Sequence, residues 1–136
     1  MKKKKKVLVV DDEPVLLNLL ISKIKEAGFE TIGAADGDEG LRKALVEHPD
    51  LILLDIVMPK MDGITVLKKL RQDDWGRKTP VIILSNLNTA EAVEKSLANG
   101  VYDYLVKIDY TLDDLVAIVK KRLAAEDAKD AKKAKK

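Results

Sequence analysis

Residues 51–63 read Leu51-Ile-Leu-Leu-Asp55-Ile-Val-Met-Pro59-Lys-Met-Asp-Gly63, and the start of this stretch decides the fold. Four consecutive apolar residues lead directly into an aspartate. A short, continuously apolar run is typical of a strand that is buried on both faces. Such strands occur in parallel sheets that carry helices on both sides.

Four further runs predict strands along the chain. Two of them, Val7–Val10 and Val81–Leu84, are also continuously apolar, which again favours strands in the middle of a sheet. The run Glu30–Ala34 is weaker and more polar, as an edge strand can be. The last run is Tyr102–Val106.

Helical patterns separate these strands. Pro14 suits the first position of a helix, and apolar residues then recur at helical spacing until Gly28. A third helix is expected over about Ile64–Gln72, and the fourth should end at Asn99-Gly100. Capping oxygens stand three residues before an acid in three pairs: Asp36 and Glu39, Asn88 and Glu91, Thr111 and Asp114.

Strict alternation of strand and helix predicts an α/β fold, a doubly wound parallel sheet between two helical layers. Five such units in 136 residues fit a three-layer sandwich and fall short of an eight-fold barrel. We find neither an internal repeat nor an interdomain linker, so a single domain is expected.

Composition excludes several classes of protein. The chain has no cysteine, which excludes disulfides, thiolate zinc sites and thiol catalysis. A hydrophobic content of 46% argues against intrinsic disorder. The N-terminal lysines resemble the start of a signal peptide, but the apolar run after them is too short and meets two acids. No apolar stretch approaches the roughly 18 residues of a membrane span.

The net charge of +2 hides an uneven distribution. Lys2–Lys6 contribute +5 and residues 129–136 contribute +4, which leaves residues 7–128 at −7. The body of the chain is therefore acidic, and a basic nucleic-acid-binding surface on it is not supported. We interpret the lysine-rich ends as solvated, with weak polyanion binding as the alternative.

Polar residues end four of the predicted strands: Asp11-Asp12, Asp55, Ser85 and Lys107. In an open parallel α/β sheet, ligands bind at the carboxyl ends of the strands, near the point where the strand order reverses. These four strand ends would therefore converge on one small pocket.

The residue types in this pocket suit phosphoryl transfer. Three crowded carboxylates repel one another, and a hard cation such as Mg²⁺, which prefers oxygen ligands, relieves that repulsion. Zinc and copper are disfavoured because nitrogen and sulfur ligands are absent, and the single histidine, His48, is interpreted as a surface residue. Carboxylates, a lysine and a hydroxyl can position and neutralise a phosphoryl group.

The sequence resembles the response regulator receiver family of bacterial two-component systems, in its single-domain, chemotaxis-regulator-like form. The resemblance spans roughly residues 6–123 and rests on four signatures in order: Val7-Leu-Val-Val-Asp-Asp-Glu-Pro14, residues 51–63, Pro80-Val-Ile-Ile-Leu-Ser85 and Gly100-Val-Tyr-Asp-Tyr-Leu-Val-Lys107. It implies a flavodoxin-like sheet in the order 2-1-3-4-5 with five helices. Residues 1–5 would be a basic tail, and residues 124–136 an extension of the last helix or a second tail.

The resemblance implies a phosphoacceptor and a metal site. Asp55 would be the carboxylate that forms the acyl phosphate. Asp12 would bind the metal directly and Asp11 through water, with Asp55 and the backbone carbonyl of Val57 as further ligands. The implied metal is Mg²⁺, with Mn²⁺ as the alternative.

The resemblance also implies a switch. Ser85 and Lys107 would contact the phosphoryl oxygens, and Tyr104 matches the aromatic residue that rotates inward when the hydroxyl moves. An ordinary strand aromatic is the alternative for Tyr104. Gly63 is expected to supply a permissive backbone in the loop beside the acceptor.

The lifetime of the phosphorylated form is expected to be long. Two positions that resemble those aligning the attacking water in the family hold Val57 and Leu87 here, and neither side chain can hydrogen-bond a water. The alternative is that both residues pack the loop and Asn86 positions the water.

The chain departs from the family pattern at two positions. Ile108 follows Lys107 where the family has a proline in cis, so a trans peptide and a reshaped loop are expected. Asn86 follows Ser85 where the family has a very small residue, and it either narrows access to Asp55 or adds a hydrogen bond. Trp75 is interpreted as a loop residue that packs its own turn, with a partner contact as the alternative.

The resemblance implies a cytoplasmic switch, phosphorylated by a sensor histidine kinase or a phosphotransfer protein, that catalyses only its own phosphorylation and dephosphorylation. Output through the fourth helix, fifth strand and fifth helix, to a homodimer or a downstream protein, is the family expectation. The rival is a degenerate receiver that binds without phosphorylation. A dehalogenase-like phosphatase is disfavoured because Val57 stands where its second aspartate should be, and a P-loop hydrolase because its motif is missing.

Overall fold

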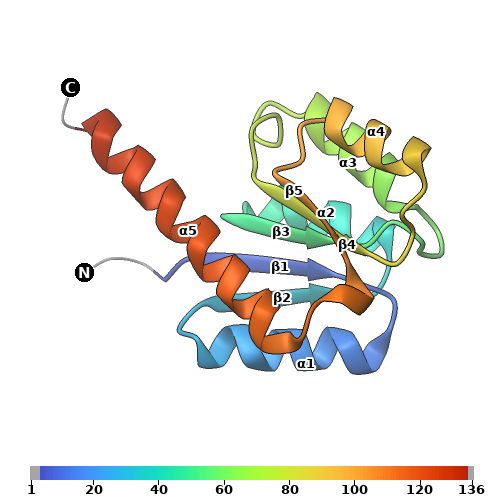
Figure 1. Cartoon of the computed structure of the whole chain (residues 1–136). Coiled ribbons are helices and arrows are strands. Elements are labelled where there is room, and N and C mark those ends of the chain that lie inside the picture. The colour runs from blue at the N-terminus through green and yellow to red at the C-terminus, as the bar shows by residue number, and fades with distance from the viewer. Residues whose placement is uncertain (1–3, 135–136) are drawn as a thin grey trace.

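The computed structural model describes residues 4–134, and it describes side chains as far as residue 126. Five strands alternate with five α-helices, and a short 3-10 helix follows the last strand (Figure 1). The elements are β1 (Lys6–Val10), α1 (Pro14–Glu26), β2 (Glu30–Ala34), α2 (Gly37–Glu47), β3 (Leu51–Leu54), α3 (Gly63–Gln72), β4 (Val81–Ser85), α4 (Ala90–Ala98), β5 (Asp103–Val106), η1 (Lys107–Asp109) and α5 (Leu112–Ala134).

The five strands form one parallel sheet in the order β2-β1-β3-β4-β5. The predicted α/β fold, its strand order and its five helices are therefore confirmed. The weakly apolar run Glu30–Ala34 forms the edge strand β2, and the continuously apolar runs form the three inner strands, as expected.

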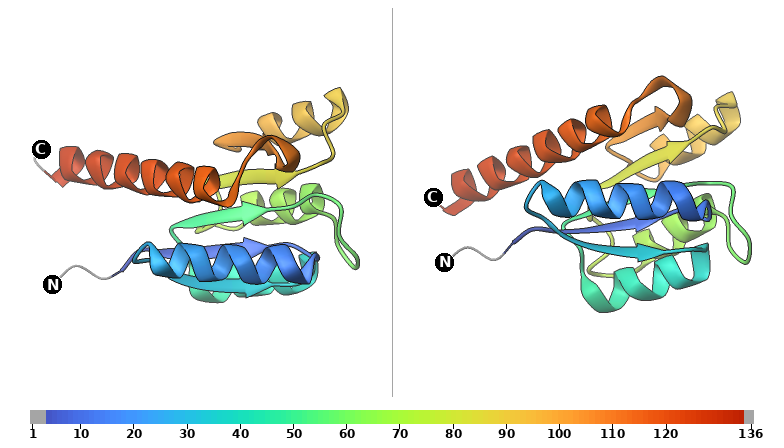
Figure 2. Two further views of the ribbon diagram at one scale, coloured as in Figure 1. Left: turned by 60° about the horizontal axis from the view of Figure 1, so that its bottom comes forward. Right: turned by 90° about the horizontal axis from the view of Figure 1, so that it is seen from below.

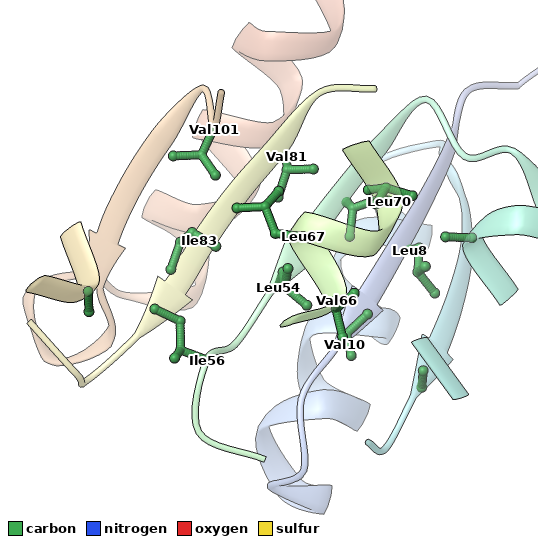
Figure 3. Close-up of a cluster of buried hydrophobic side chains, with 14 residues drawn as sticks. Leu8, Val10, Leu54, Ile56, Val66, Leu67, Leu70, Val81, Ile83 and Val101 are labelled. Carbon is green, nitrogen blue, oxygen red and sulfur yellow. The ribbon is translucent and has the colours of Figure 1, made fainter. Parts of the chain in front are cut away.

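Each inner strand buries both of its faces. In β1, Val7 and Val9 pack into one core cluster, while Leu8 and Val10 pack into the other. The first cluster lies under α1 and α5; the second lies under α2, α3 and α4, and Figure 3 shows its side chains between the sheet and α3. Alternate residues of a strand point to opposite faces, so a continuously apolar strand needs a helical layer on each side.

The last helix, α5, extends beyond the sheet. Figures 1 and 2 show α5 running back along the sheet and continuing past it, on the side away from the strand arrowheads. The helix ends at Ala134, so the segment from Ala124 onward continues α5 as far as the structure describes it. Among residues 4–134, no helix is long and apolar enough to cross a membrane.

Two of the three predicted helix caps are confirmed, and one is wrong. Asp36 accepts the backbone N–H of Glu39, and Thr111 and Asp114 form reciprocal hydrogen bonds. The fourth helix is capped by Thr89, whose hydroxyl accepts the N–H of Ala92, and not by Asn88. Asn and Thr are both good N-cap residues. Which of the two adjacent residues caps α4 therefore depends on the path of the loop.

Gly63 has a different role from the expected one. Positive φ angles occur at Gly28 and Gly100 among the described glycines, and not at Gly63, so a permissive backbone is not what this position needs. A Cβ at Gly63 would lie 2.1 Å from the carbonyl oxygen of Asp55 and 2.8 Å from Ile56 Cα. The missing side chain lets α3 begin directly against the chain that follows β3, and the Gly63 N–H donates to the Ile56 carbonyl at 2.8 Å.

Gly63→Ala should therefore destabilise the fold by about 1–3 kcal/mol, the usual cost of overpacking a tight site. Gly33→Ala is the matched control, because the atoms nearest to its Cβ would be flexible side-chain ends, those of Ile21 at 2.5 Å and Leu17 at 3.3 Å. Urea unfolding of both variants measures the difference. Equal losses in the two variants would contradict the close-approach role of Gly63.

Candidate functional site

The polar residues that end the strands come together at one edge of the sheet. Val10 of β1 pairs with Leu54 of β3, so Asp11 and Asp55, one residue further on, are neighbours. On the other side, Ser85 of β4 pairs with Val106 of β5, which places Lys107 beside this group. The register of the parallel strands thus produces the predicted convergence.

Three carboxylates form an acidic cluster at this edge. Asp11, Asp12 and Asp55 each offer a carboxylate oxygen, and these atoms all lie within 4.8 Å of one another. Asp11 and Asp55 are buried, with 2% and 5% exposure, whereas Asp12 is exposed. Oxygen ligands so close together have the chemistry that a hard divalent cation requires.

Lys107 joins the two buried carboxylates. Its ammonium lies 2.9 Å from Asp11 Oδ2 and 2.9 Å from Asp55 Oδ2, and its side chain is only 9% exposed. The remaining Asp55 oxygen, Oδ1, accepts the backbone N–H of Ile56 at 2.7 Å. Asp55 is therefore held at both oxygens.

The electrostatics of the cluster follow from burial and pairing. Burial disfavours the charged form of Asp11 and raises the pKa of its carboxyl above the ordinary value, although hydrogen bonds from Lys107 and Glu13 act in the opposite direction. Burial alone would lower the pKa of Lys107, but its hydrogen bonds to Asp55 and Asp11 outweigh that effect and raise it. Lys107 is a permanent cation here.

A pocket of about 230 Å³ opens over Asp55. Its lining contains most of the residues that the sequence singled out, and Glu13 in addition: Asp12, Glu13, Asp55, Val57, Ser85, Asn86, Leu87 and Lys107. Ser85 is buried, while Val57 is 62% exposed and Leu87 is partly buried.

The expected switch residue, Tyr104, contacts the loop after β4. Its hydroxyl donates to the backbone carbonyl of Leu87. Burial raises the pKa of Tyr104, and the negative charge of Asp55 raises it further. The described position of the ring is half-buried, and the predicted inward rotation stays a prediction.

Both departures from the family pattern are resolved in the structure. The Lys107–Ile108 peptide is trans, as expected, since the described residues contain no cis peptide bond. Of the two alternatives for Asn86, the added hydrogen bond is observed: its Oδ1 accepts the backbone N–H of Ile108 at 3.2 Å.

Three further contacts had little or no signal in the sequence. Glu13, the third acid of Asp11-Asp-Glu13, reaches Lys107 at 3.3 Å, and its place beside the two aspartates was the available signal. His48 is exposed, as expected, but its ring stacks on Trp75 with centroids 4.3 Å apart. Trp75 is partly buried against the core, so it packs on more than its own turn.

Comparison with known proteins identifies the family to which the chain belongs. A family model described as the response regulator receiver domain matches residues 7–120. The chain is 42% identical over 103 residues to the alkaline phosphatase synthesis transcriptional regulatory protein PhoP of Bacillus subtilis, covering 76% of this chain and 42% of that protein. It is 43% identical over 115 residues to the transcriptional regulatory protein PrrA of Mycobacterium tuberculosis, covering 85% of this chain and 48% of that protein. The chain thus spans about half the length of these curated relatives.

Solved structures show the same fold. A CheY-like response regulator receiver domain protein from Methanospirillum hungatei JF-1 superposes with a TM-score of 0.86 at 28% identity, covering 93% of this chain and 99% of that one. The receiver domain of the Francisella response regulator 1452 gives a TM-score of 0.75 at 39% identity, covering 88% and 99%. With the family model matching most of its length, this chain belongs to the response regulator receiver domain family of two-component signal transduction.

Proposed function

We propose that this receiver domain accepts a phosphoryl group on Asp55 in the presence of Mg²⁺ and signals through protein–protein contacts. The observation that carries the proposal is the convergence of three carboxylates and one buried ammonium around Asp55. In the transfer, a carboxylate oxygen of Asp55 forms a bond to phosphorus while the bond from phosphorus to the donor breaks. With a phosphohistidine donor, the broken bond is P–N and the imidazole leaves.

The donor set fits the proposed metal. Asp11, Asp12 and Asp55 supply oxygen ligands only, which suits Mg²⁺, or Mn²⁺ as an alternative. The backbone carbonyl of Val57 would be a further oxygen ligand. The cation would neutralise charge on the phosphoryl oxygens. It would also relieve the repulsion among carboxylates whose oxygens lie within 4.8 Å of one another.

The protein's own residues would do the remaining work. Lys107 already contacts Asp55 and can pair with a phosphoryl oxygen on the same carboxylate. Ser85 lines the pocket and can donate its hydroxyl to another phosphoryl oxygen. These contacts neutralise and position the group, which is most of what phosphoryl transfer requires of a protein. We propose that the domain catalyses its own phosphorylation and dephosphorylation only.

The proposed output begins at the loop after β4. Tyr104 contacts this loop through the Leu87 carbonyl, and Ser85 stands at its start. A hydroxyl drawn toward the phosphoryl group would shift the loop and release Tyr104 to rotate inward. Phosphorylation would bias a two-state equilibrium of the surface formed by α4, β5 and α5. A second copy of the chain or a downstream protein would bind that surface.

The proposed phosphodonor is a sensor histidine kinase or a phosphotransfer protein, and the proposed location is the cytoplasm. Both rest on membership of the family. Two of the curated relatives are named as transcriptional regulators, and this chain covers about half the length of each. Control of transcription is therefore an activity of those relatives.

Asp55→Asn should abolish phosphorylation. A small phosphodonor such as acetyl phosphate with Mg²⁺ should add the mass of one phosphoryl group to the wild type, because Asp55 is the carboxylate at the centre of the pocket. Intact mass spectrometry measures the gain, and chelation of Mg²⁺ should remove it. Asp38→Asn, an exposed position at the start of α2, is the control and should label normally. Full labelling of Asp55→Asn would overturn the assignment, and a wild type that never labels would favour the degenerate receiver.

Mg²⁺ should raise the stability of the folded protein, because it binds the native cluster and not the unfolded chain. At a concentration of about 100 times the dissociation constant, the free energy of unfolding should rise by about 2.7 kcal/mol. Asp12→Ala should lose this gain and be no less stable without metal, because Asp12 is exposed and the ion pairs of Lys107 among the described residues go to other acids. Thermal unfolding with and without Mg²⁺ tests both statements. Asp38→Ala should keep the gain, and a wild-type melting temperature that ignores millimolar Mg²⁺ would contradict the metal site.

Leu87→Glu should shorten the lifetime of the phosphorylated form. Val57 and Leu87 line the pocket with Asp55. We propose that these apolar side chains, which cannot hydrogen-bond a water, shield the phosphoryl group from an aligned one. Since general acid–base assistance is worth about 10²–10⁴-fold, even a poorly placed glutamate should speed the decay several-fold. Decay of the phosphoprotein in Mg²⁺ is the measurement, with Leu87→Met as the apolar control. If Leu87→Glu changes nothing and Asn86→Ala slows the decay, Asn86 positions the water and the shielding account is wrong.

A further inference from the structure

The two positions at which this chain departs from the family pattern contact each other. Asn86 Oδ1 accepts a hydrogen bond from the backbone N–H of Ile108, with 3.2 Å between the two atoms. The residues come after β4 and β5, whose last paired residues are Ser85 and Val106. The hydrogen bond therefore joins the two chain segments again just beyond the sheet.

Ile108 has little else to fix its place. Ile108 as a whole is 81% exposed, so apolar packing holds little of it. It lies in the three-residue helix η1, and 3-10 turns have poor hydrogen-bond geometry. The N–H that Asn86 engages is also the group that a proline at this position would lack. The hydrogen bond to Asn86 thus supports the η1 turn, and it requires a residue other than proline at position 108.

This hydrogen bond lies one residue away from Lys107, whose buried ammonium is part of the site. Lys107 directly precedes Ile108, and its ammonium must reach Asp55 Oδ2 and Asp11 Oδ2, each at 2.9 Å. Asn86 is itself well anchored, because it directly follows Ser85, a buried residue at the end of β4. The hydrogen bond can therefore transmit the rigidity of β4 to the turn that carries Lys107.

We propose that Asn86 is a positioning residue: through the Ile108 N–H it holds the η1 turn and, with it, the Lys107 ammonium against Asp55. The effect on rate rests on the proposed phosphorylation of Asp55, whereas the hydrogen bond itself does not. A neutral hydrogen bond between exposed residues contributes little net free energy, so its loss should slow phosphorylation by about 2- to 10-fold and not abolish it.

The kinetic experiment measures the effect of Asn86→Ala in three backgrounds. These are wild type, Ile108→Ala, which keeps the backbone N–H, and Ile108→Pro, which removes it. The rate of phosphorylation by acetyl phosphate at saturating Mg²⁺ is followed by intact mass. Asn86→Ala should slow the first two backgrounds by the same factor and add nothing in the third, whatever Ile108→Pro does alone. Asn88→Ala, in the same loop and also exposed, is the matched control and should leave the rate unchanged.

Two kinetic outcomes would overturn the proposal. If Asn86→Ala leaves the wild-type rate unchanged, Asn86 does not position Lys107. If Asn86→Ala slows the Ile108→Pro background by the same factor as the wild type, Asn86 acts by a route other than the Ile108 N–H, such as a direct contact with the phosphoryl group.

A second measurement needs no phosphorylation. Amide hydrogen exchange of Ile108 in the unphosphorylated protein should speed up in Asn86→Ala and stay unchanged in Asn88→Ala. Unchanged exchange of Ile108 in Asn86→Ala would overturn the proposal even if Asp55 is phosphorylated. If Asn86→Ala speeds the exchange of Ile108 but acetyl phosphate never phosphorylates the protein, the hydrogen bond is supported and the proposed function is rejected.

Discussion

The ion pairs of Lys107 with Asp11 and Asp55 are the constraint on which the site depends. Two carboxylates that are buried side by side repel each other, and each loses its hydration. Lys107 offsets part of this cost with one ammonium that lies 2.9 Å from each. Because removing one partner of a buried pair leaves an uncompensated charge, β1, β3 and β5 must deliver their end residues to the same point. The register of the sheet and the position of the η1 turn are therefore electrostatic requirements as well as packing ones.

The core meets this requirement by leaving the strands little freedom. β1 alternates between two hydrophobic clusters, so a shift of one residue would exchange its faces and move Asp11 away from Asp55. The chain after Asp55 is fixed separately, because α3 starts at Gly63 against the Asp55 carbonyl with no room for a Cβ. Asp62 then caps that helix through the Thr65 N–H. Packing on both faces of the strands and the tight turn after β3 thus fix the position of the Asp55 carboxylate.

Much of this arrangement could be predicted from the sequence, because it depends on periodicity and on the residue type that ends each strand. The five strands and the convergence of the residues that end them required only that apolar runs be buried and that parallel strands end at one edge. The strand order was instead implied by the resemblance to the receiver family. The contacts that could not be predicted join residues through the actual path of a loop. Thr89 caps α4 in place of its neighbour Asn88, His48 stacks on Trp75 from another loop, and Asn86 reaches the Ile108 N–H. Residues of a suitable type stand at neighbouring positions of each turn, and the sequence does not distinguish between them. The path of the loop in three dimensions decides which of them makes the contact.

The two ends of α4 are held in different ways, which bears on the proposed route from Asp55 to the surface of α4, β5 and α5. Arg71 of α3 donates to the carbonyls of Asn99 and Gly100 at 2.8 and 3.1 Å, and to those of Gly76 and Thr79 at 2.7 and 2.8 Å. The guanidinium therefore ties the C-terminal end of α4 to α3 and to the loop before β4. The N-terminal end is attached to the loop of residues 86–89, whose Leu87 carbonyl accepts the Tyr104 hydroxyl. Hydrogen bonds from Arg71 hold one end of α4, and the other end follows the loop that contains Asn86 and Leu87, so a tilt about the held end would break fewer of these contacts than a translation would. Under the proposed function, a displacement that starts at Ser85 would reach the surface as a tilt of α4, with the largest movement at the end nearest Asp55.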